Sequence, residues 1–122
     1  MVTKMKVDVL GTKYTIKQVD AGKDEYMEKM SFGGYCDCGE KEIVILNMRT
    51  CPGWEKDTEA IIKDKENEIL RHELIHAFLN ESGLQHNSHI PDKAWAKNEE
   101  MVDWFAIQMP KIIKAYKEVG CI

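Results

Sequence analysis

The chain has 122 residues, of which 43% are hydrophobic and 31% are charged, and its formal net charge is -4. This length suits one domain with a single core, which we place over residues 1–122. The acidic balance argues against nucleic acid as a partner, and the lack of an apolar run of about 18 residues argues against a membrane span. Residues 1–9 also lack the apolar core of a signal peptide, so we expect a cytoplasmic protein.

The first half of the chain predicts two β-hairpins. Residues 4–10 and 14–18 alternate in polarity on either side of a turn near Gly11. Residues 35–38 and 42–47 repeat this arrangement across Gly39 and Glu40. A helical turn is expected between the hairpins, over residues 24–30. We therefore expect a small, mostly antiparallel sheet.

The second half begins with a long predicted helix. Asp57 or Thr58 can cap its start, and Gly83 suits the left-handed position that ends a helix. The charged residues 63–68 are interpreted as its solvated half. Residues 69–79 are apolar almost all round, which is typical of a buried helix.

A second helix is predicted to start near Asp92 or Ala96. Apolar residues then follow at helical spacing as far as Tyr116. Pro110 interrupts the pattern, and it either kinks this helix or begins a new one.

The first helix carries His72, Glu73 and His76 among its apolar residues. Residues four apart lie on one helix face, so both imidazole rings can reach one metal ion. Glu73 lies beside them, where its carboxylate can accept a proton from the attacking water of a hydrolysis. The alternative is a chance match, with both histidines hydrogen-bonded in the core.

A catalytic zinc site needs three protein ligands, and the second helix offers the third. Glu99 and Asp103 are four apart and share a helix face. We expect Glu99 to bind the metal and Asp103 to accept a hydrogen bond from the far nitrogen of a ligating imidazole. Glu100 is an alternative ligand, and both glutamates also suit an exposed helix start.

His86 and His89 are the histidine candidates for the third ligand. The extended metzincin pattern has glycine three residues after the second motif histidine and histidine six after it, whereas Leu79 and Ser82 stand here. A looser arrangement could still bring His89 to the metal. The other interpretation is that both are exposed loop histidines.

These motifs, within residues 70–113, resemble those of the gluzincins, the thermolysin-like group. The short gap and the tail after Glu99 are similar to small zincin-like peptidases of phages and mobile elements, related to the ImmA/IrrE group. The resemblance implies a minimal zincin-like α+β domain, with the sheet packed on both ligand-bearing helices. It implies Zn²⁺ bound by His72, His76 and Glu99. It also implies Glu73 as the general base and Asp103 as the carboxylate behind one of the ligands.

The implied activity is that of a zinc metalloendopeptidase, with a protein or peptide substrate such as a repressor or host factor. Two alternatives stay open: a zinc-binding regulatory or interaction protein without efficient proteolysis, and a metal-dependent hydrolase of another substrate. Thermolysin itself has a further histidine that steadies the oxyanion, and no histidine follows Glu99 here. The candidates for that role are Tyr35, Tyr116, His86 and His89.

Two further features have open interpretations. Cys36, Cys38, Cys51 and Cys121 are expected to be reduced thiols, although a disulfide set or a second metal site beginning at Cys36 is an alternative. Residues 43–46 form the most apolar strand. An extended peptide could add to that strand at a sheet edge, or the strand could be central and paired on both sides.

Overall fold

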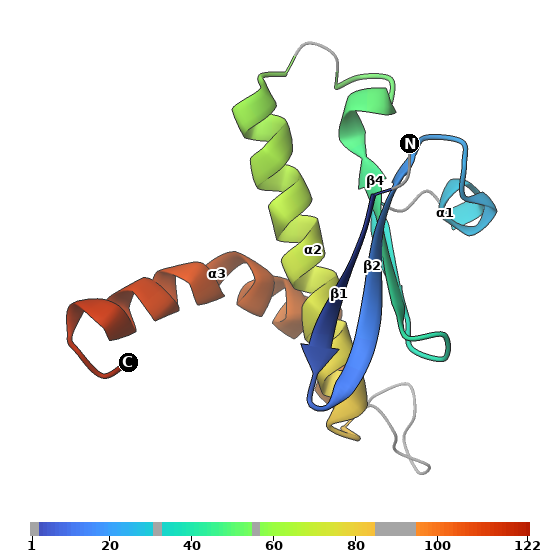
Figure 1. Cartoon of the computed structure of the whole chain (residues 1–122). Coiled ribbons are helices and arrows are strands. Elements are labelled where there is room, and N and C mark those ends of the chain that lie inside the picture. The colour runs from blue at the N-terminus through green and yellow to red at the C-terminus, as the bar shows by residue number, and fades with distance from the viewer. Residues whose placement is uncertain (1–2, 31–32, 55–56, 85–94) are drawn as a thin grey trace.

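The computed structural model describes residues 3–30, 33–54, 57–84 and 95–122, which form an α+β fold (Figure 1). The strands of its one sheet are β1 (Thr3–Val9), β2 (Thr12–Asp20), β3 (Gly34–Asp37) and β4 (Glu42–Asn47). The α-helices are α1 (Glu25–Met30), α2 (Glu59–Glu81) and α3 (Glu99–Glu118), and 3-10 turns lie at Met48–Thr50 and Trp95–Lys97.

Both predicted hairpins are present in the sheet, whose strand order is β1-β2-β4-β3. Strands β1 and β2 pair antiparallel, and so do β3 and β4. Leu10 and Gly11 join the first pair with φ angles of 50° and 91°, which suits the twist of a two-residue hairpin turn. The pairing between the hairpins, β2 with β4, is parallel, so the sheet is mixed. Hairpin turns specify only their own two strands, and nothing local predicts how the hairpins join.

Strand β4 is central, because β2 pairs on one side of it and β3 on the other. Ile43 and Ile45 pack toward α2, and Val44 packs on the opposite face with Met27 of α1. These three residues at the middle of β4 are all buried. The alternative that residues 43–46 form an edge strand open to substrate is therefore wrong.

Helix α2 crosses one face of the sheet (Figure 1). The Thr58 side chain accepts a hydrogen bond from the amide of Ile61, and Gly83 follows the last turn with a φ of 83°, as predicted. The helix approaches β3 closely at Gly34. A Cβ atom there would lie 2.7 Å from Ile69 Cγ2, so the glycine permits this contact.

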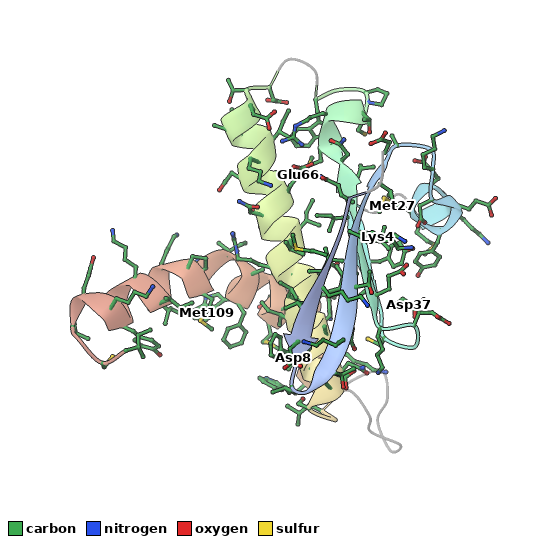
Figure 2. All side chains as sticks on the ribbon, viewed as in Figure 1. Lys4, Asp8, Met27, Asp37, Glu66 and Met109 are labelled. Carbon is green, nitrogen blue, oxygen red and sulfur yellow. The ribbon has the colours of Figure 1, made fainter. Side chains whose placement is uncertain are left out.

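The prediction of a solvated half over residues 63–68 is wrong for Glu66, which is only 2% exposed. Figure 2 shows Glu66 on α2 next to the segment that leaves β4. Its carboxylate accepts hydrogen bonds from Arg49 Nη1, the Met48 amide and Gln18 Nε2. These partners offset the cost of burying the charge, because buried carboxylates need hydrogen bonds and an opposite charge.

The expected all-round burial of residues 69–79 is also only partly correct. Ala77 is fully buried against the sheet, but Phe78 is 42% exposed. Most of the other residues are half-buried. Helix α2 therefore has one core face and a second face that α3 covers in part.

Helix α3 begins at Glu99, where the Asn98 side chain accepts a hydrogen bond from the Met101 amide. Ala96 lies in the preceding 3-10 turn, and Asp92 lies outside the described residues. Val102 and Ala106 are buried where α3 crosses α2, and the rest of α3 extends away from the sheet (Figure 1). Within the described part of the chain, no helix combines the length and apolar character that crossing a membrane requires.

Pro110 lies inside α3, which is one continuous helix. Proline has no amide hydrogen, so it cannot donate to the carbonyl four residues earlier, which is that of Ala106. Arg71 Nε of α2 donates to this carbonyl oxygen instead, at 2.6 Å. The backbone hydrogen bond that is missing at Pro110 is thus replaced by a contact between α3 and Arg71, the residue before His72.

Candidate metal centre

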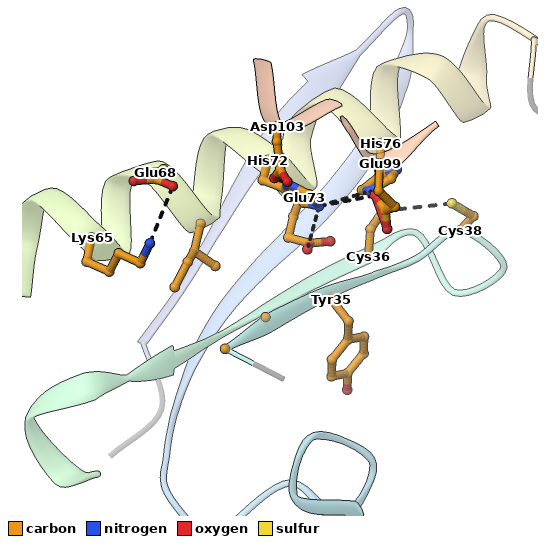
Figure 3. A pocket seen from close by; sticks show the side chains of 13 residues that line it. Tyr35, Cys36, Cys38, Lys65, Glu68, His72, Glu73, His76, Glu99 and Asp103 are labelled. Carbon is orange, nitrogen blue, oxygen red and sulfur yellow. Dashed lines mark hydrogen bonds and ion pairs between the residues drawn. The ribbon is translucent and has the colours of Figure 1, made fainter. Parts of the chain in front are cut away.

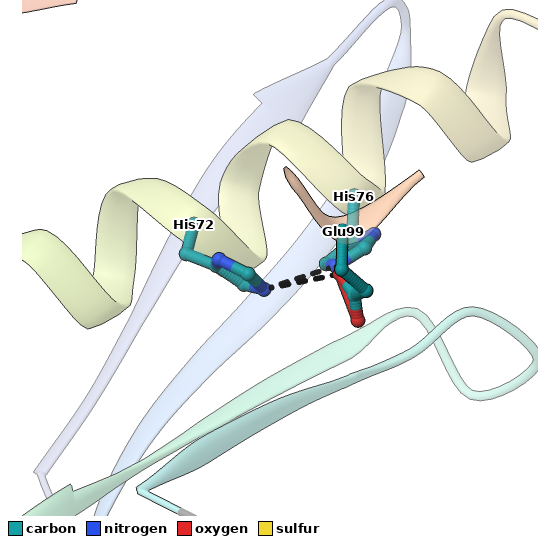
Figure 4. A group of neighbouring side chains, drawn as sticks. All are labelled: His72, His76 and Glu99. Atoms are coloured by element: carbon teal, nitrogen blue, oxygen red, sulfur yellow. Dashed lines mark hydrogen bonds and ion pairs between the residues drawn. The ribbon is translucent and has the colours of Figure 1, made fainter. Parts of the chain in front are cut away.

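His72, His76 and Glu99 converge where the start of α3 meets α2 (Figure 4). Nε2 of His76 lies 2.7 Å from Oε1 of Glu99, and Nε2 of His72 lies 3.4 Å from the same oxygen. The two Nε2 atoms are 3.1 Å apart. Two residues four apart on one helix and the first residue of another therefore present three ligand atoms to one point.

These separations suit a metal ion. Ligands placed tetrahedrally at zinc distances lie about 3.3 Å from one another. The separations of 3.4 and 3.1 Å are close to that value, and the separation of 2.7 Å is shorter. Two imidazole nitrogens and one carboxylate oxygen are common ligands of divalent transition metals. The His72, His76 and Glu99 group could hold a metal ion.

Asp103 lies one turn after Glu99 and contacts the other side of the His72 ring. Its Oδ1 is 2.7 Å from Nδ1 of His72. A carboxylate can only accept, so Nδ1 carries the proton and Nε2 keeps its lone pair for a metal. The spacing of Glu99 and Asp103 on α3 places both on the face toward α2.

Glu73 is buried beside this group, with Oε1 3.8 Å from Nε2 of His72. Burial raises the pKa of Glu73 to about 7, nearby His72 opposes the shift, and Glu99 adds to it. A cation on the neighbouring ligands would lower this pKa. Glu73 contributes no atom to the ligand group, so its carboxylate stands next to the centre without belonging to it.

The His76 ring is also largely shielded from water. Burial lowers its pKa, although the carboxylate of Glu99 acts in the opposite direction. A neutral imidazole is the form that binds a metal. Burial therefore favours the neutral state of the His76 ring.

A cavity of about 470 Å³ opens beside the centre (Figure 3). Helix α2 forms one wall with its two histidines and Glu73, and Gly33 forms another together with the first three residues of β3. Glu99 and Asp103 of α3 complete the metal side, and Cys36 and Cys38 also reach the lining. A cavity of substrate size thus lies next to the candidate metal centre.

Several sequence candidates do not join this group. Glu100 is exposed and is not among the ligand atoms. Tyr35 reaches the cavity, but its hydroxyl donates to Asp24 Oδ2 at 2.7 Å. Tyr116 is 47% exposed and does not line the described cavity. His86 and His89 lie outside the described residues.

Sequence reasoning missed the contributions of Arg71 and of β3. Arg71 donates a hydrogen bond to the carbonyl of Ala106. The one sequence feature that points to this contact is Pro110, which lies four residues after Ala106 in α3. Strand β3 lies beside the site because of the strand order of the sheet and because α2 approaches it closely at Gly34. No local sequence pattern predicts either feature.

No family model, curated protein or solved structure matches this chain. The assignment of function therefore depends on the geometry and chemistry of the site alone.

Proposed function

We propose that this protein is a zinc-dependent hydrolase of peptide bonds, with a zincin-like arrangement of its two ligand-bearing helices. One observation carries the proposal. Three ligand atoms from His72, His76 and Glu99 converge while a buried carboxylate, that of Glu73, stands next to them without joining them. A purely structural zinc site has four protein ligands and no need for such a group.

Two nitrogens and one oxygen form a donor set that suits zinc. Zinc in such a site polarises a scissile carbonyl and lowers the pKa of water. Three protein ligands would leave a fourth position for water or substrate, and His72, His76 and Glu99 all line the cavity.

Glu73 is the general base in this proposal. Its carboxylate lies within 3.8 Å of a ligand nitrogen, close enough to accept a proton from water that attacks beside the metal. Glu73 then passes the proton to the leaving amine.

We propose that β3, at the sheet edge, holds an extended substrate. The Leu46 amide donates to the Gly33 carbonyl, and hydrogen-bonding pairs alternate along an antiparallel ladder. The main-chain groups of Gly34 and Cys36 therefore point away from β4. A peptide could pair with them as a further strand along the cavity, which favours a protein or peptide substrate such as a repressor or host factor.

The test compares zinc-loaded wild type with Glu73→Gln on a proteome-derived peptide library, read by mass spectrometry. We expect cleavage by wild type and a loss of about 100-fold or more in the variant, with zinc content unchanged. Glu100→Gln, on the exposed start of α3, is the control and should cleave normally.

Equal cleavage by wild type and Glu73→Gln would show that Glu73 is not the general base. Zinc binding without any cleavage by wild type would instead favour the alternative, a zinc-binding regulatory or interaction protein.

A further inference from the structure

Cys36 and Cys38 form a close thiol pair at the end of β3. Their Sγ atoms are 3.8 Å apart, and both residues line the cavity next to the candidate metal centre (Figure 3). The proposed function uses neither thiol. Cys51 and Cys121 are also free thiols, so the protein contains its own comparison groups.

The local backbone explains why these two side chains meet. Cys36 is the third residue of β3, and Cys38 lies in the turn between β3 and β4. The Asp37 carboxylate accepts hydrogen bonds from the Gly39 and Glu40 amides, at 3.1 and 3.0 Å, and so stabilises this turn. The turn brings the two sulfurs into contact, and a disulfide bond of about 2.05 Å needs them to approach further by less than about 2 Å.

The two thiols differ in their surroundings. Cys36 packs against the apolar cluster beneath α2, whereas Cys38 lies near the ammonium group of Lys41. The hydrogen bond with Cys36 and the charge of Lys41 lower the pKa of Cys38 to about 7. The pKa of Cys36 is raised by that hydrogen bond and by burial. Cys38 is therefore the attacking thiolate and Cys36 the resolving thiol.

We propose that Cys36 and Cys38 are a redox-active thiol pair that closes to a disulfide by exchange with a small-molecule disulfide such as oxidised glutathione. The Cys38 thiolate attacks one glutathione sulfur and releases the first glutathione thiolate. The Cys36 thiol gives its proton to that thiolate, and its sulfur attacks Cys38 and releases the second one. The protein loses two electrons, and one oxidised glutathione becomes two reduced molecules.

Closure would change one wall of the cavity, because both sulfurs line it with His72 and His76. The exchange itself needs no metal and does not rest on the proposed hydrolase activity. A failure of one proposal therefore leaves the other standing.

The test incubates the protein with glutathione buffers of rising oxidised fraction, followed by acid quenching, alkylation and intact mass measurement. We expect wild type to lose Cys36 and Cys38 thiols together, without bound glutathione at either residue. Cys36→Ser lacks the resolving thiol, so it should accumulate glutathione on Cys38. Matched controls are Cys51→Ser and Cys121→Ser, which should keep the paired loss.

Two results would overturn the proposal. One is stable glutathione on Cys38 of wild type, to the same extent as in Cys36→Ser. The other is a pair that stays reduced in buffers where the exposed Cys121 has already reacted. Peptide mapping assigns each modification to its residue, and circular dichroism confirms that each variant is folded.

Discussion

Oδ1 of Asp103 lies 2.7 Å from Nδ1 of His72, while Nε2 of the same ring faces Glu99. One residue of α3 thus contacts a candidate ligand on α2, and another residue of α3, one turn earlier, is a candidate ligand itself. The relationship makes the contact between the two helices part of the proposed metal site.

Removal of the Asp103 carboxylate should therefore weaken metal binding without removing a ligand. We expect Asp103→Ala to bind zinc about 10- to 100-fold more weakly, because the His72 ring loses its fixed orientation and tautomer. Asp103→Asn keeps an acceptor and should lose less. Competition with a chromophoric chelator measures the affinity. Glu118→Ala, an exposed carboxylate on the same helix, is the control, and equal affinity in all variants would contradict this role.

Glu99 and its neighbour Glu100 provide a test of the third ligand. Only Glu99 has an oxygen within the ligand group, although both side chains are exposed. Glu99→Ala should weaken zinc binding by more than the roughly 10- to 100-fold loss typical of residues behind a ligand. Glu100→Ala should bind zinc normally. The reverse result would identify Glu100 as the third ligand. Asp103 would then lose its assigned role of orienting the His72 ring.

The contact between Arg71 and the Ala106 carbonyl makes a double-mutant prediction. In Arg71→Met the carbonyl is left unpaired in a buried position, at a cost of about 1–3 kcal/mol. Pro110→Ala supplies the missing amide donor, so it should stabilise Arg71→Met more than it stabilises wild type. Urea unfolding of the four proteins gives this difference. Additive effects would show that Pro110 and Arg71 act independently.

Glu81 anchors the last turn of α2 to the first hairpin and to Lys41. Its carboxylate accepts hydrogen bonds from Lys41 Nζ, Tyr14 Oη and Thr12 Oγ1 at 2.8, 2.7 and 3.1 Å. The contact with Lys41, followed by that with Tyr14, lowers the pKa of Glu81 to about 2. A lowered pKa stabilises the folded state above the ordinary value of 4.5, and this contribution disappears as the pH falls through about 2.

Glu81→Gln should therefore have a lower melting temperature than wild type at pH 7. The difference should shrink below pH 4.5 and close near pH 2. Melting curves at several pH values check this, with Glu118→Gln as the exposed control. A difference that stays constant down to pH 2 would mean that the charge of Glu81 is not what stabilises the fold.

The sequence predicts the parts of this fold that have local causes. Alternation of polarity and Gly11 indicated the first hairpin, and Thr58 and Gly83 bounded α2 to within a residue or two. Helical spacing also predicted the faces on which His72, Glu99 and Asp103 meet. Each of these features depends on residues within a few positions of one another.

Features that depend on distant partners escaped prediction. Glu66 looked like a solvated charge, because Arg49 and the Met48 amide approach it only in the folded chain. The parallel pairing of β2 with β4 likewise has no local cause. The contact between Cys36 and Cys38 is local and is an exception: it depends on the Asp37-stabilised turn, which the spacing of the two cysteines alone does not specify.

The central claim is that His72, His76 and Glu99 bind one metal ion. Elemental analysis of untagged protein, dialysed against zinc and then against buffer, tests it most directly. We predict about one zinc per chain for wild type and almost none for folded His76→Ala. Wild type without stoichiometric metal, or His76→Ala with as much zinc as wild type, would contradict the account.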